Sequence, residues 1–128
     1  MRWVVSDSST LIHLAKIGRL GLLQKLYERI IIPPAVWREV VEQGEGRAGA
    51  MEVADARQHG WIKVVTPARR IAELYGLSKT GIIGILIRAK REGQISSLQE
   101  ELEKQRDVAG FWIDETFYQE TLSAVGEI

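Results

Sequence analysis

The sequence contains no cysteine and only two histidines, so it has neither disulfide bonds nor thiolate metal sites. The spacing of His13 and His59 is not that of a zinc site. The apolar run after Arg2 is interrupted at once by Ser6 and Asp7, so it is too short for a signal peptide or a membrane span. We therefore expect a soluble protein of the reducing cytoplasm that has no membrane attachment.

Net charge is also absent, because 17 basic residues balance 17 acidic ones. This balance argues against a strongly electrostatic nucleic-acid binder. The distribution is uneven, however: six basic residues stand against one acid between Arg69 and Arg91, and nine acids stand against two basic residues from Glu92 onward. This pattern fits a phosphate-binding surface with an acidic, shielding tail, and it equally fits ordinary solvated helix faces.

With 128 residues, of which 45% are hydrophobic, the chain can build one core, which predicts a single domain over residues 1–128. Short apolar, β-branched segments predict strands at Arg2–Ser6, Arg29–Ile32 and Trp61–Val65. Helical patterns follow each strand and fill the C-terminal part, at Ser9–Ile17, Leu20–Tyr27, Ala35–Gln43, Ala50–His59, Arg69–Tyr75, and after Gly81, Ser97 and Asp114. This alternation predicts an α/β fold with a parallel sheet, helices on both of its faces and a helical C-terminal part.

Asp7 is the residue with the strongest functional signal. It ends the first predicted strand and directly precedes a predicted helix. That position puts its carboxylate at the carboxyl edge of the sheet, where open α/β folds build their sites. A carboxylate there is also a good N-cap for the following helix, and the sequence leaves this purely structural role open.

Residues Gly44–Gly49 match the pattern G-x-G-x-x-G. A dinucleotide fingerprint requires a strand before the pattern, whereas a predicted helix precedes it here. We interpret this segment as a flexible connection.

Two long segments of the chain resemble the PIN-domain superfamily: VVSDSSTLIHLAKIGRL at residues 4–20 and IPPAVWREVV at residues 32–41. The second half is also similar, from Ala72-Glu73 through Thr80-Gly81 to Ile95. The similarity is greatest to the small prokaryotic group described as VapC-like or as predicted nucleic-acid-binding PIN proteins. The resemblance implies a PIN-like three-layer fold with a short, mainly parallel sheet of three or four strands.

The resemblance also implies a site. PIN domains are Mg²⁺- or Mn²⁺-dependent ribonucleases, because phosphodiester hydrolysis needs a hard cation that neutralises phosphate charge and activates water. Carried over by position, Asp7 and Glu39 would be the catalytic acids and the metal ligands, with Ser8 and Ser9 orienting the site and its nucleic acid. For Glu39, the role of an ordinary exposed acid on a helix remains open.

One part of the family pattern is missing. Between Val65 and Arg69 the family has a helix and a strand, but this chain has only Thr66-Pro67-Ala68. Such a crossover takes a dozen residues or more, and the third and fourth family acids would be lost with it. We therefore expect a PIN-like nucleic-acid-binding protein, related to toxin-type endoribonucleases, with impaired catalysis. Two alternatives remain open: an active single-strand endoribonuclease of a toxin–antitoxin pair that uses Asp7 and Glu39, and a non-catalytic dimeric interaction protein.

The expected partners follow from these features. Arg69 and Arg70 are the candidates for contact with a nucleic-acid backbone, so RNA is a possible partner. Loss of the strand would expose the edge of Trp3-Val4-Val5, which predicts a homodimer formed by strand or helix exchange. If the protein is a toxin, we also expect an antitoxin that covers its groove.

Overall fold

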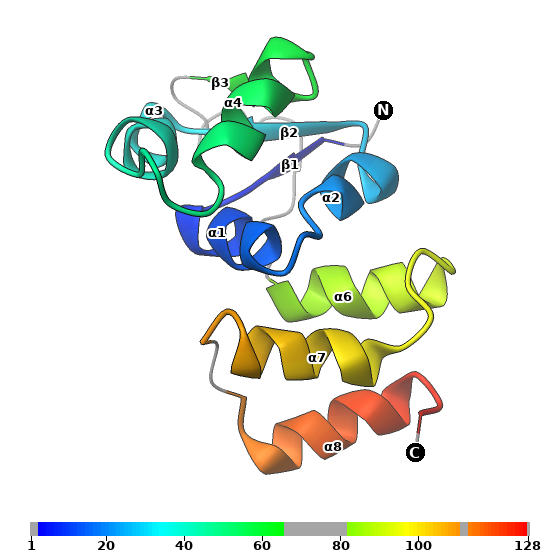
Figure 1. Cartoon of the computed structure of the whole chain (residues 1–128). Coiled ribbons are helices and arrows are strands. Elements are labelled where there is room, and N and C mark those ends of the chain that lie inside the picture. The colour runs from blue at the N-terminus through cyan, green and yellow to red at the C-terminus, as the bar shows by residue number, and fades with distance from the viewer. Residues whose placement is uncertain (1–2, 66–81, 111–112, 128) are drawn as a thin grey trace.

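The computed structural model describes residues 3–65, 82–110 and 113–127 of the 128-residue chain (Figure 1). Three strands form one sheet: β1 (Trp3–Val5), β2 (Arg29–Ile32) and β3 (Ile62–Val64). All three strands were predicted within one or two residues of these bounds. The predicted helix at Arg69–Tyr75 lies outside the described residues.

The sheet is parallel with the strand order β1-β2-β3. Val4 is paired with Ile30, and Ile30 is paired with Ile62. A parallel pair needs a crossover between its strands, and the helices between β1, β2 and β3 provide it. The predicted mixed α/β class with a short parallel sheet is therefore confirmed. Within the described residues, β1 has one neighbouring strand and lies at an edge of the sheet.

Both faces of the sheet are covered at its centre. Ile30, Ile31 and Ile32 of β2 are all 0% exposed, although successive side chains of a strand point to opposite faces. A strand buried on both faces is the mark of a parallel sheet with helices on either side. The prediction of helices on both faces is confirmed for this strand.

Most of the helices begin and end close to the predicted residues. Between the strands lie α1 (Ser8–Lys16), α2 (Gly21–Leu26), α3 (Pro34–Trp37), the π-helical segment η1 (Arg38–Glu42) and α4 (Ala50–Gln58). The C-terminal part contains α6 (Ile82–Arg91), α7 (Leu98–Asp107) and α8 (Glu115–Ala124). None of the helices in the described ranges is long and apolar enough to cross a membrane.

The helix predicted at Ala35–Gln43 differs from the expectation. It begins at Pro34, which suits a first helical position because its missing N–H would have no partner there. From Arg38 the winding changes to a π-helix, so the predicted regular helix is a composite of α3 and η1. Hydrophobic periodicity cannot distinguish these windings over so few residues.

The three C-terminal helices lie one beside the next, with α6 against α1 and α2 and α8 farthest from the sheet (Figure 1). Ser97 caps α7 by accepting a hydrogen bond from Glu100 N at 3.2 Å. Asp114 caps α8 in the same way, accepting from Phe117 N at 3.1 Å. Both caps were predicted from spacing alone, because each connects residues three positions apart.

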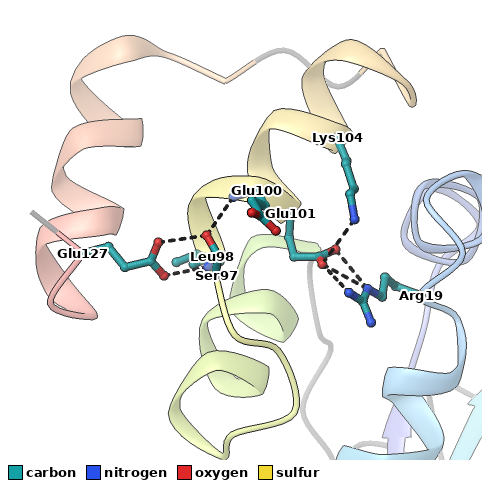
Figure 2. A network of polar contacts seen from close by, with 7 residues as sticks. All are labelled: Arg19, Ser97, Leu98, Glu100, Glu101, Lys104 and Glu127. Atoms are coloured by element: carbon teal, nitrogen blue, oxygen red, sulfur yellow. Dashed lines mark hydrogen bonds and ion pairs between the residues drawn. The ribbon is translucent and has the colours of Figure 1, made fainter.

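A polar network docks α7 onto the rest of the molecule (Figure 2). Arg19, between α1 and α2, donates to both carboxylate oxygens of Glu101, and its shortest distance is 2.6 Å from Nη2 to Oε1. Lys104 Nζ lies 3.8 Å from the same Oε1. Glu101 is only 2% exposed, so this carboxylate depends on its cationic partners.

Glu127 supplies a second cap to the start of α7 (Figure 2). Its carboxylate accepts hydrogen bonds from Leu98 N at 2.6 Å and Gln99 N at 3.0 Å, and it lies 3.5 Å from Lys90 Nζ. Burial alone would raise the pKa of Glu127, but the amides of Gln99 and Leu98 and the charge of Lys90 more than offset burial, so the pKa is lowered.

Candidate metal and nucleic-acid site

Asp7 stands where β1 becomes α1, at the carboxyl edge of the sheet. Its Oδ1 accepts a hydrogen bond from Thr10 N at 2.9 Å, so the carboxylate caps α1. The preceding Ser6 is buried, and its hydroxyl donates to the Asp7 carbonyl at 3.2 Å. The structure therefore confirms the capping role, and it leaves the Asp7 side chain half-buried at the edge where a ligand would approach.

Glu39 reaches the same edge from a different element. Ser8 Oγ donates to Glu39 Oε2 at 3.0 Å, across 31 residues of sequence. Ser8 is 8% exposed at the start of α1, whereas Glu39 is an exposed residue of η1. Because β1 and β2 are parallel neighbours, the helices that follow them begin at one edge, and this topology brings Glu39 to the residue next to Asp7.

Of the other predicted site residues the structure describes only Ser9, and its hydroxyl bonds elsewhere. Ser9 is exposed, and its hydroxyl lies 3.3 Å from His13 Nδ1, one helical turn further along α1. Arg69 and Arg70, the predicted nucleic-acid contacts, lie outside the described residues. Helical periodicity explains the difference between the two serines, because Ser8 shares a buried face with Leu11 whereas Ser9 points to solvent.

The donor set suits one hard divalent cation. Two carboxylates and a hydroxyl are oxygen donors, and Mg²⁺ needs only one or two carboxylates because it keeps several of its waters. Within the ranges that the structure describes, no group of three or more histidine, cysteine, aspartate or glutamate side chains could hold a metal ion. Asp7 and Glu39 thus offer the number of carboxylates that one Mg²⁺ ion requires.

A family model described as a PIN domain matches residues 3–68 and 66–127 of this chain. The two matched segments meet at residues 66–68 and together span nearly the whole sequence. No curated protein and no solved structure matches this chain.

Proposed function

Because this chain belongs to the PIN-domain family, we propose that it binds single-stranded RNA at a site where Asp7 and Glu39 hold one Mg²⁺ or Mn²⁺ ion, and that its ribonuclease activity is weak. The observation that carries the proposal is the 3.0 Å hydrogen bond from Ser8 Oγ to Glu39 Oε2. It holds the acid of η1 beside the residue that follows Asp7. A nuclease-type fold with two acids at one sheet edge suits the binding of a phosphate through a metal ion.

The residues of the chain have separate parts in this proposal. The hydrogen bond that Asp7 accepts from Thr10 N fixes the direction of the Asp7 carboxylate, and the Ser8 hydroxyl holds the exposed Glu39 side chain in place. A bound divalent ion would supply charge neutralisation at the phosphate and a lower pKa for bound water. Among the described residues no cluster of three or more histidine, cysteine, aspartate or glutamate side chains could hold a metal ion, and a site with only two acids supports weak catalysis.

The division of the family match also supports weak catalysis. The two matched segments overlap at residues 66–68, the position where we expect the helix, the strand and two acids of the family pattern to be missing. A chain that lacks this segment would be matched in two pieces of this kind. The remaining pair of acids would then bind one ion without completing the family's acidic cluster.

The test compares RNA binding and cleavage in the wild type and the Asp7→Asn variant, with and without Mn²⁺. Asparagine is as good an N-cap as aspartate, so Asp7→Asn keeps the fold while removing the negative charge. The matched control is Asp114→Asn, because Asp114 also caps a helix by accepting from an amide three residues on. Thermal unfolding should show both variants within about 0.5 kcal/mol of the wild type, since the two residues rank equally as caps.

We expect Mn²⁺ to strengthen RNA binding by the wild type and by Asp114→Asn, and to have no such effect on Asp7→Asn. Cleavage should be slow and should require both Mn²⁺ and Asp7. RNA binding that depends on neither metal nor Asp7 would refute the proposed site. Rapid, multiple-turnover cleavage that requires Asp7 would instead support the alternative of an active toxin-type endoribonuclease.

A further inference from the structure

The helix that carries Glu39 changes its winding where this residue lies. Gln43 N donates to Arg38 O at 2.7 Å, which spans five residues instead of the four of an α-helix. Isolated π-helical turns are rare in proteins and occur frequently at functional sites. A π-helical turn needs a structural cause, and Gly44, which follows this turn, supplies it.

Gly44 closes the turn by packing its bare backbone against the carbonyl groups of η1. A Cβ atom at Gly44 would lie 2.2 Å from Val40 O, 2.9 Å from Val40 C and 3.2 Å from Glu39 O. These three neighbours are backbone atoms, so no change of rotamer could relieve the overlap. Gly44 is not among the glycines of positive φ, and its requirement is therefore space rather than an unusual conformation.

The two peptide groups that meet Gly44 differ in how freely they can move. Val40 is 1% exposed and belongs to the hydrophobic core. Glu39 is exposed, and its side chain is held by the hydrogen bond from Ser8. A Cβ at position 44 would overlap most severely with the Val40 carbonyl, and because the Val40 side chain is fixed in the core, relief requires a shift of the η1 backbone. The Glu39 peptide group belongs to that backbone, so its carboxylate would move relative to Ser8.

We propose that Gly44 is a positioning residue for Glu39, an inference that rests on the proposed metal site. The absence of a side chain at Gly44 lets η1 keep its π-helical turn, and that turn directs the Glu39 carboxylate to Ser8 and the edge that bears Asp7. The first glycine of the G-x-G-x-x-G pattern thus serves the candidate site through sterics, without binding a phosphate.

The test measures Mn²⁺ affinity by isothermal titration calorimetry in the absence of RNA. Gly44→Ala should weaken Mn²⁺ binding about tenfold, the lower end of the effect of residues that orient metal ligands. Gly84→Ala is the control, because a Cβ at Gly84 in α6 would meet nothing within 4 Å, and it should leave the affinity unchanged. Glu39→Gln should also weaken binding, and adding Gly44→Ala to Glu39→Gln should cause no further loss, since Gly44 acts through Glu39.

A second variant covers the case in which Gly44→Ala fails to fold. Deletion of Glu42, the exposed last residue of η1, would shorten the five-residue turn to an α-helical one while Gly44 stays in place. We expect this deletion to weaken Mn²⁺ binding as Glu39→Gln does. Wild-type affinity in either folded variant, or additive losses in the double variant, would overturn the role of Gly44.

A metal-free measurement separates this inference from the proposed function. In the amide NMR spectrum of the apo protein, Gly44→Ala should shift the resonance of Ser8, whose hydroxyl contacts Glu39, and Gly84→Ala should not. If the wild type binds no Mn²⁺, the proposed function fails, and a shifted Ser8 resonance would still support the positioning of Glu39. If Ser8 is unaffected by Gly44→Ala, the inference fails whether or not Mn²⁺ binds.

Discussion

Removal of Arg19 should show how strongly α7 depends on its buried carboxylate. Glu101 is 2% exposed, and Arg19 donates to its Oε1 at 2.6 Å and to its Oε2 at 3.1 Å. In Arg19→Met the apolar stem remains, but among the described residues Glu101 then keeps only Lys104 as a cationic partner, at 3.8 Å. The substitution therefore leaves a buried charge with weak compensation.

The size of the effect follows from burial. Breaking a fully buried ion pair costs about 3–5 kcal/mol, much of it from the charge left behind. The side chains of Arg19 and Lys104 are 37% and 46% exposed, so water screens part of this charge. We expect Arg19→Met to lower the free energy of unfolding by about 3 kcal/mol, which is roughly a hundredfold in the folding equilibrium.

The assay is urea denaturation followed by far-UV circular dichroism, with the free energy of unfolding obtained by linear extrapolation. Arg106→Met is the matched control on α7, because Arg106 and Asp107 form an ion pair with side chains 48% and 64% exposed. An exposed pair contributes little, so we expect the urea midpoint of this control to stay at the wild-type value.

The double variant Arg19→Met/Glu101→Met gives the decisive comparison. It removes the buried charge together with its partner, so its stability should exceed that of Arg19→Met alone. A double variant that is less stable than Arg19→Met would refute this reasoning. It would show that the buried Glu101 carboxylate stabilises the fold even without Arg19, instead of costing free energy.

Three further changes test other parts of the fold. The pKa of Glu127 is lowered, so its contribution to stability is complete above the ordinary value of 4.5 and is lost as pH falls through the lowered pKa. Urea titrations at neutral and acidic pH should therefore show a smaller acid-induced loss of stability for Glu127→Gln than for the wild type. The exposed Glu120→Gln is the control. Gly84→Ala should raise the stability by up to about 1 kcal/mol, because alanine favours a helix and the site has room; a lower thermal midpoint would contradict it. Ile31→Ala should lower the free energy of unfolding by about 3 kcal/mol, because this fully buried side chain fills the second covered face of the sheet. A loss of less than about 1 kcal/mol in urea denaturation would contradict this estimate and would mean that the face collapses around the smaller residue.

Features that depend on near neighbours could be predicted from the sequence. Asp7, Ser97 and Asp114 cap helices by binding amides three residues on, so their spacing is sufficient evidence. The β-branched segments and the helical patterns between them likewise predicted the parallel sheet. The second cap of α7 was not predictable, because Glu127 lies 29 residues from Leu98.

At the candidate site, too, contacts between distant residues could not be predicted from the sequence. The sequence located Asp7 at a strand end, and the resemblance to PIN domains named Glu39, but both treated Ser8 and Ser9 alike. The tertiary structure separated them, since only Ser8 faces η1 and donates to Glu39. It also revealed that Gly44 packs against backbone carbonyls, which no glycine pattern specifies.

The sequence by itself determined the order of strands and helices, the caps that begin α1, α7 and α8, and the acid at the end of β1. Local propensity and short-range hydrogen bonds set these features, so they are encoded within a few residues. The tertiary structure alone decided the pairs Ser8–Glu39 and Arg19–Glu101, which join residues 31 and 82 positions apart. Such pairs form only where packing of the sheet and helices brings distant side chains together, and packing is a property of the whole chain.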